Sequence, residues 1–112
     1  MEARTELLIM KAFVITIENI PESVKSAERC IASGVKCGVN VKIHYGFTPE
    51  NDPVSMFETM GLSTKNFESN KYSRYERCLS AFLSHRSLWT ACSEQKENFL
   101  ILEHDAVFNN AL

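Results

Sequence analysis

The stretch FLILEHDAVF, residues 99–108, decides the fold prediction because charged residues directly follow an unbroken apolar run. Residues 99–102 have the length and composition of a strand covered on both faces, which is typical of a parallel sheet. Glu103, His104 and Asp105 follow at the carboxyl end of this strand. In open α/β sheets, ligands bind beyond the carboxyl ends of the strands. The stretch therefore predicts a parallel sheet with polar side chains at a ligand-binding edge.

Two earlier segments predict the other strands of the sheet. Residues 12–17, AFVITI, are a short apolar run rich in β-branched side chains. Residues 39–45, VNVKIHY, alternate apolar and polar side chains, and this alternation places His44 on the exposed side. The chain thus reads strand, helix, strand, helix, strand, an order that predicts a single α/β domain over residues 1–112.

Helical spacing of apolar residues predicts the connecting helices. The first covers residues 22–33, with Gly34 as its C-terminal cap. Residues 54–71 predict a short helix and an irregular loop, and residues 73–95 predict a long helix. One apolar arc of the long helix is expected to face the core: Tyr75, Cys78, Leu79, Phe82, His85 and Trp89. Ser84 falls away from the centre of this arc.

Composition excludes several classes of function. The chain has 112 residues and a net charge of −2, and its twelve basic residues are scattered, so nucleic acid is not an expected partner. No apolar run approaches the roughly 20 residues of a membrane span. The N-terminus begins with acidic residues and has no positively charged start, so we expect no signal peptide and a cytoplasmic location.

The spacing of the four cysteines fits no zinc finger or ribbon. Cys78 and Cys92 occupy apolar positions of the long helix, which favours free thiols packed as small hydrophobic groups in a reducing compartment. A disulfide between Cys30 and Cys37 is the alternative.

The charged end of the last strand has two interpretations. Residues two apart in an extended chain point to the same side, so Glu103 and Asp105 are expected together, with His104 facing away. Two carboxylates suit Mg²⁺ or Mn²⁺, which take their remaining ligands from water and phosphates. An acidic pair of this kind is also common where a strand enters an ordinary solvated loop.

The segment CLSAFLSHRSLW, residues 78–89, followed after a short gap by FLILEHDAVF, resembles the lipopolysaccharide-type glycosyltransferases of family 25. Members of that family include bacterial and collagen galactosyltransferases. They have a helix with a Leu-Ser-His pattern and a later Trp, then a strand that ends in Leu-Glu-Asp-Asp. The matching residues here are Leu83, Ser84, His85 and Trp89 in the helix, and Leu102, Glu103 and Asp105 at the strand end. AFVITIENI and GFTPENDP also look like the family's first strand and the loop after its second strand.

The chain departs from the family pattern at several positions. His104 stands in place of the middle acid of Glu-Asp-Asp, and Thr16 replaces the Asn usual in the first strand. Ser80 and Ala81 occupy positions where Gly and Cys are frequent. The chain thus resembles a divergent member of the family.

The resemblance implies a Rossmann-like GT-A fold in which this chain is the N-terminal, donor-binding part of a glycosyltransferase. Such an enzyme transfers a sugar from a nucleotide-sugar to a glycan or lipid-linked acceptor, for example in lipopolysaccharide biosynthesis. It implies Mn²⁺ or Mg²⁺ at Glu103 and Asp105, with the cation bound to the donor diphosphate. Donor-binding residues would then include Ser84, His85, Glu18, Asn19 and Gly46.

Alternatives remain open for several of these residues. His85 is either a donor contact or a buried neutral imidazole that holds the helix against the sheet. Gly46 either allows close approach of the backbone to the nucleotide or is a simple turn glycine. A complete GT-A domain is longer than this chain, so we expect a missing C-terminal half or a homo-oligomer that covers an open sheet edge. The alternative function is a non-catalytic α/β interaction module.

Overall fold

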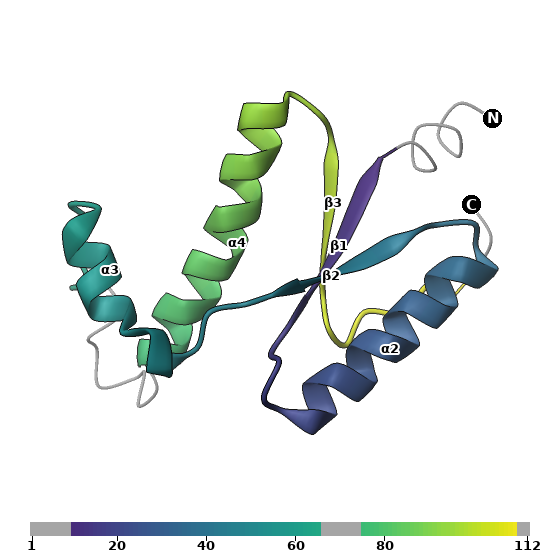
Figure 1. Cartoon of the computed structure of the whole chain (residues 1–112), viewed down its shortest axis with the longest axis horizontal. Coiled ribbons are helices and arrows are strands. Elements are labelled where there is room, and N and C mark those ends of the chain that lie inside the picture. The colour runs from purple at the N-terminus through teal and green to yellow at the C-terminus, as the bar shows by residue number, and fades with distance from the viewer. Residues whose placement is uncertain (1–9, 66–74, 110–112) are drawn as a thin grey trace.

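Three short strands form one parallel sheet (Figure 1). β1 (Lys11–Thr16) lies in the centre, between β2 (Val41–Tyr45) and β3 (Phe99–Glu103). The strand bounds differ by one or two residues from those predicted. The computed structural model describes residues 10–65 and 75–109.

Helices connect these strands and flank the sheet. α2 (Pro21–Lys36) joins β1 to β2, and η1 (Pro49–Asn51), α3 (Pro53–Thr59) and α4 (Tyr75–Gln95) lie between β2 and β3. α2 and α4 lie on opposite sides of the sheet (Figure 1). The prediction of a small α/β fold with a parallel sheet flanked by helices is confirmed. The end of the predicted loop and the predicted start of the long helix lie outside the described residues.

The sheet face toward α2 forms the first apolar core. Val14 of β1 pairs with Ile43 on one side and with Leu102 on the other, so alternate residues of all three strands share this face. Its fully buried side chains come from β1, from α2 and from the chain entering β2: Ala12, Val14, Ala27, Cys30, Val39 and Val41. Removing such side chains from water is the main stabilising contribution of this layer.

The end of α2 differs from the prediction, which placed a cap at Gly34. The helix continues to Lys36, and Gly34 is buried inside it. A Cβ at this position would lie only 2.9 Å from the Val39 carbonyl oxygen, so the close approach of the chain requires a glycine. Gly38 takes the left-handed conformation, with φ of 78°. The Gly38 and Val39 amides donate to the carbonyls of Val35 and Gly34, at 3.1 and 2.7 Å, which closes a Schellman motif.

β3 is less covered than the unbroken apolar run predicts. Residues 99–102 are half-buried rather than enclosed on both faces. The reason is the strand order β2-β1-β3, which puts β3 at an edge of the sheet.

The buried face of α4 also differs from the predicted arc. Leu79 is buried as predicted. Leu83, Leu88 and Ser84 are also buried although they lie outside the predicted arc, whereas Trp89, which belongs to it, is 50% exposed. Leu79 and Leu83 form a second core with Phe57 of α3 rather than with the sheet. The buried serines lose no hydrogen bonds, because Ser80 and Ser84 each donate to the carbonyl four residues earlier, at 2.8 Å. A helical wheel that treats serine as a surface residue therefore misplaces this face.

His44 is half-buried, so the prediction that it is exposed is wrong. Its Nε2 lies 2.9 Å from the Ser87 hydroxyl of α4, and its ring meets the edge of Phe13 at a centroid distance of 6.4 Å. Ser87 of α4 thus reaches His44 on the polar side of β2, a contact that alternation along one strand cannot show. Burial lowers the pKa of His44 below its usual value.

This lowered pKa predicts a dependence of stability on pH. The unfolded chain takes up the His44 proton near pH 6.5, whereas the folded chain takes it up only at lower pH, so the free energy of unfolding should fall as the pH drops below about 6.5. His44→Gln should flatten that part of the profile in urea denaturation between pH 7.5 and 5.5. Parallel profiles for the two proteins would contradict the prediction.

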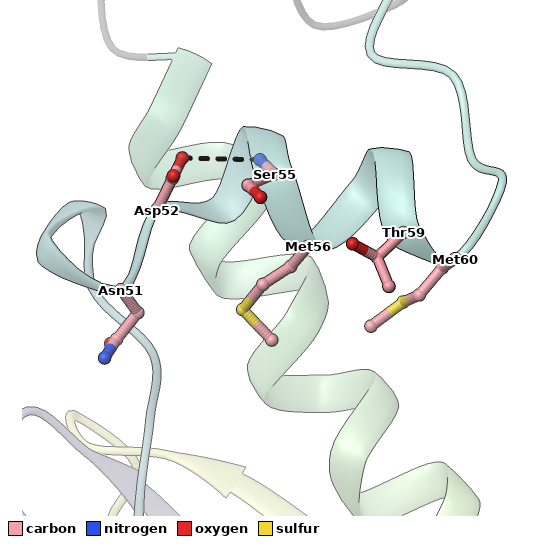
Figure 2. Close-up of a pocket in the computed structure, with 6 residues that line it drawn as sticks. All are labelled: Asn51, Asp52, Ser55, Met56, Thr59 and Met60. Atoms are coloured by element: carbon pink, nitrogen blue, oxygen red, sulfur yellow. Dashed lines mark hydrogen bonds between the residues drawn. The ribbon is translucent and has the colours of Figure 1, made fainter.

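α3 begins at a capped N-terminus beside a small pocket (Figure 2). The Asp52 carboxylate accepts the amide hydrogen of Ser55 at 3.3 Å, although Asp52 itself takes a left-handed conformation with φ of 52°. The pocket has a volume of about 230 Å³ and is lined by Met56 and Met60 together with short polar side chains. It is a largely apolar depression over α3.

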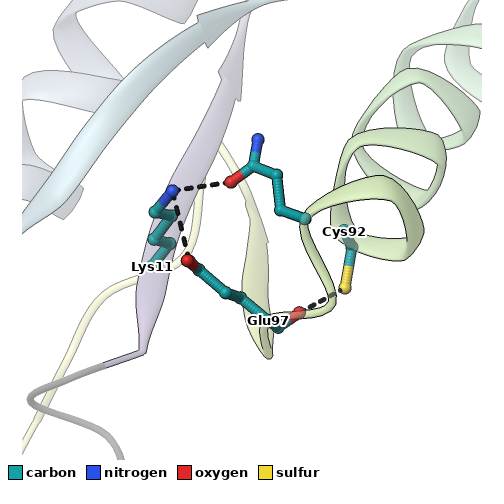
Figure 3. A network of polar contacts seen from close by, with 4 residues as sticks. Lys11, Cys92 and Glu97 are labelled. Carbon is teal, nitrogen blue, oxygen red and sulfur yellow. Dashed lines mark hydrogen bonds and ion pairs between the residues drawn. The ribbon is translucent and has the colours of Figure 1, made fainter.

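The far end of α4 is tied to the start of β1 (Figure 3). Lys11 Nζ donates to Gln95 Oε1 at 2.6 Å and forms an ion pair with Glu97 Oε2 at 3.2 Å. The Cys92 thiol donates to the Glu97 carbonyl at 2.9 Å. Lys96 turns the chain with φ of 52°, so these contacts surround the turn that leads into β3.

All four cysteines are free thiols, and the alternative disulfide between Cys30 and Cys37 is not formed. Cys30 and Cys37 are buried, whereas Cys78 and Cys92 are partly exposed. Burial also raises the pKa of the Cys30 thiol, which disfavours its reactive thiolate. Within residues 10–65 and 75–109, no helix is long and apolar enough to cross a membrane.

These differences predict the order of alkylation. Under native conditions iodoacetamide should modify Cys78 and Cys92 well before Cys30, and four labels should be added after denaturation without reductant. Mass spectrometry of the labelled peptides measures both. Cys30 and Cys37 left unlabelled in the denatured chain would show a disulfide and contradict the prediction.

Candidate functional site

A cavity of about 520 Å³ opens at the carboxyl ends of the strands. The end of β1 and the residues after it contribute Ile15, Ile17 and Asn19, and the segment after β2 contributes residues 47–50. The end of β3 contributes residues 103–105. All three strand ends therefore meet in one cavity, as the position of the charged stretch predicts.

The strand order explains why a cavity forms there. From β1 the chain crosses by α2 to one neighbouring strand, and it returns by α4 on the other side of the sheet to reach β3. The two connections diverge at the carboxyl ends of β1 and β3, which leaves a crevice that neither helix fills. In α/β proteins this switch point is where ligands bind.

The N-terminal half of α4 forms the remaining wall. Its residues recur at helical spacing along one face: Arg77, Ser80, Ala81, Ser84 and His85. The predicted residues Ser84 and His85 thus lie in the cavity with Asn19, Glu103 and Asp105. Arg77 was not predicted, although its position four residues before Ala81 on the same face would have indicated it.

Charge in the cavity is dominated by acids. Glu50, Glu103 and Asp105 face one Arg77, so the lining carries a net charge of −2 when its histidines are neutral. The Glu103 side chain is 72% exposed, and its Oε1 lies 3.8 Å from His85 Nε2, an ion pair only if the imidazole is protonated. An anionic ligand would therefore be repelled unless a cation accompanied it.

The expectation that His104 faces away from the two acids is wrong. β3 ends at Glu103, and the chain turns there, with the Ala106 amide donating to the Glu103 carbonyl at 3.0 Å. Strand alternation does not continue through this turn, so His104 lines the cavity together with Glu103 and Asp105. Its Nδ1 lies 3.3 Å from the hydroxyl of Ser23.

Ser84 holds the wall of the cavity in position. Its Oγ accepts the amide hydrogen of Phe47 and donates to the Ser80 carbonyl, both at 2.8 Å. Gly46 lies directly against it, since a Cβ at Gly46 would be 2.8 Å from Ser84 Oγ and 3.1 Å from Ile15 Cγ2. The close approach at Gly46 is thus made to the protein's own helix, and Gly46 does not line the cavity.

Glu18 also lies outside the cavity lining and is exposed. Its neighbour Asn19 is the polar residue after β1 that reaches the cavity. Glu50 and Phe47 complete the lining from the loop after β2; the sequence indicated this loop, but not which of its side chains turn inward.

The metal-ligating side chains of the cavity suit a site that the protein completes only in part. Within the part of the chain that the structure describes, no three His, Cys, Asp or Glu side chains lie close enough to hold a metal ion. Glu103 and Asp105 supply two carboxylates, which fits Mg²⁺ or Mn²⁺ because these ions take further ligands from water and substrate phosphates. The residues fit a cation that arrives with a phosphate ligand, not a closed structural site.

Comparisons with protein-family models, with curated proteins and with solved structures found no match.

The contact between Gly46 and Ser84 predicts a stability effect. Gly46→Ala should lower the free energy of unfolding by about 1–3 kcal/mol, because the added methyl overlaps a buried, hydrogen-bonded oxygen. In urea denaturation, Gly46→Ala should cost less in a Ser84→Ala background, where that oxygen is gone. Additive effects of the two substitutions would contradict the contact.

Proposed function

We propose that the chain is the donor-binding part of a metal-dependent glycosyltransferase with a Rossmann-like GT-A fold. The observation that carries the proposal is the cavity at the carboxyl ends of the three strands. It unites Glu103 and Asp105 with Ser84 and His85, the residues on which the resemblance to family 25 rests. α4 and β3 bring residues from both blocks of the resemblance, 78–89 and 99–108, to the same cavity.

The size and walls of the cavity support a nucleotide-sugar as ligand. A volume of about 520 Å³ falls within the range of small-molecule sites. Ile15, Ile17 and Phe47 offer an apolar surface for a base or sugar ring, and Asn19 offers a polar contact for the base or ribose. Two of the three acids, Glu103 and Asp105, lie at the end of β3, where Glu103 is next to Ile15 of β1. The third, Glu50, lies in the loop after β2.

The end of β3 is where we place the diphosphate of the donor. Glu103 and Asp105 would hold Mn²⁺ or Mg²⁺, and the cation would stabilise the negative charge that develops on the departing nucleoside diphosphate. Because the lining carries a net charge of −2, the diphosphate would need the cation in order to bind. His85 lies beside Glu103 and would orient that carboxylate.

A second candidate function has its own supporting observation. β2 is an edge strand with Ile43 and Tyr45 exposed, at 37% and 53%. An open strand edge with apolar side chains can add a strand from another chain. This favours an α/β interaction module or a homo-oligomer.

Light scattering tests this second candidate. Ile43→Lys should shift the measured mass toward that of the monomer, because a charge on the edge strand disfavours pairing with another chain. A monomeric wild-type protein would contradict the candidate function.

Thermal denaturation tests the glycosyltransferase proposal. Mn²⁺ and UDP or GDP together should raise the melting temperature by several degrees, more than the sum of their separate effects, because each needs the other in an acidic cavity. Asp105→Asn should abolish the joint effect. Glu28→Gln, which removes an equal charge from the exposed surface of α2, should retain it.

The proposal fails if the wild-type protein shows no shift with Mn²⁺ and any of the uridine, guanosine or cytidine nucleotides or their sugars. A joint shift that Asp105→Asn leaves intact would place the cation elsewhere.

A further inference from the structure

Ser23 and His104 join the first turn of α2 to the end of β3 at the cavity. Ser23 is 3% exposed, and its Oγ accepts the amide hydrogen of Ile17 at 2.8 Å. The same oxygen lies 3.3 Å from His104 Nδ1. The serine therefore contacts the segments that follow both β1 and β3.

Hydrogen-bond accounting decides which nitrogen of His104 carries the proton. The Ser23 hydroxyl has a single hydrogen, and within residues 10–65 and 75–109 its only acceptor is His104 Nδ1. A buried hydroxyl hydrogen without an acceptor is costly, so Ser23 donates to Nδ1. Nδ1 must then carry a lone pair, and the neutral ring carries its hydrogen on Nε2.

The Nε2–H of His104 is left for a ligand. Nε2 has no hydrogen-bond partner among the described residues, and His104 lines the cavity together with Glu103 and Asp105. A protonated Nε2 has no lone pair for a metal ion. It can donate to an oxygen held close to the two carboxylates.

We propose that His104 is a ligand-contact residue that donates from Nε2 to a phosphate oxygen, with its ring orientation and tautomer fixed by Ser23. For the identity of the ligand this inference rests on the proposed function. His104 supplies a donor where the neighbouring acids supply none, so the diphosphate is held by the cation on one side and by an N–H group on the other. Ser23 is a positioning residue and does not touch the ligand.

Two measurements test the proposal on the full chain. Long-range ¹H–¹⁵N correlation spectra at pH 8 without metal should show His104 with the hydrogen on Nε2, and Ser23→Ala should turn this into a mixture of tautomers. Calorimetry with UDP in the presence of Mn²⁺ should show affinity about tenfold or more weaker in His104→Phe, the loss of one hydrogen bond to a charged group. His104→Gln, which keeps an N–H donor, should recover part of the affinity.

The affinity for Mn²⁺ alone, followed by electron paramagnetic resonance, should be unchanged in His104→Phe and reduced in Asp105→Asn. His44→Gln is the matched control, because His44 does not line the cavity and its substitution should leave UDP affinity as in the wild type. Melting temperatures of all variants exclude unfolding as the cause of lost binding.

A hydrogen on Nδ1, a loss of Mn²⁺ affinity in His104→Phe, or unchanged UDP affinity in that variant would each overturn the inference. Failure of the proposed function is distinguishable, since the wild-type protein itself would then bind no nucleotide with Mn²⁺. In that case the proposed contact between His104 and a phosphate oxygen would fail together with the proposed function.

Discussion

The hydroxyl of Ser84 ties the segment leaving β2 to helix α4, and the shape of the cavity depends on this contact. It accepts the Phe47 amide hydrogen, while Gly46 gives the helix room to approach. The sheet has its own core on its α2 face. α4 packs through its leucines on Phe57 of α3, and it also contacts the sheet at β3 and through Ser87 at His44. The contact of Ser84 with Phe47 is the one that joins α4 to the segment leaving β2 at the cavity.

The resulting cavity combines apolar and acidic surfaces. Ile15, Ile17 and Phe47 line it together with three acids, Glu50, Glu103 and Asp105, and Glu103 is next to Ile15 in the sheet. A ligand with an uncharged ring and with phosphates bound to a cation matches this combination. The acids are exposed, and buried carboxylates without partners would be too costly.

The sequence predicted the sheet and one side of the site well, for physical reasons that concern single segments. Residues 12–17 and 99–102 are β-branched or apolar runs bounded by polar residues, and such runs form strands in most contexts. Glu103 and Asp105 could be placed in the site because the carboxyl ends of parallel strands share an edge. Neither inference requires the tertiary contacts of the segment to be known.

Other features depended on tertiary contacts and could not be predicted. Ser84 is buried because its hydroxyl bonds to the Ser80 carbonyl, which a helical wheel does not include. His44 is half-buried because Ser87 of α4 reaches it, and His104 lines the cavity because the chain turns directly after Glu103, the last residue of β3. The glycines show the same limit: Gly34 lies inside α2 against the Val39 carbonyl, whereas Gly38 takes the left-handed turn, and nothing in the sequence distinguishes the two roles.

The position of β3 has a consequence for the order of folding. β1 and β2 are joined by a short connection, whereas β3 must find β1 across almost the whole described chain. Pairing over such a separation closes a long loop and forms late. Glu103, His104 and Asp105 arrive only with that last step, so a chain emerging from the ribosome would have its first two strands assembled before any site for a ligand existed.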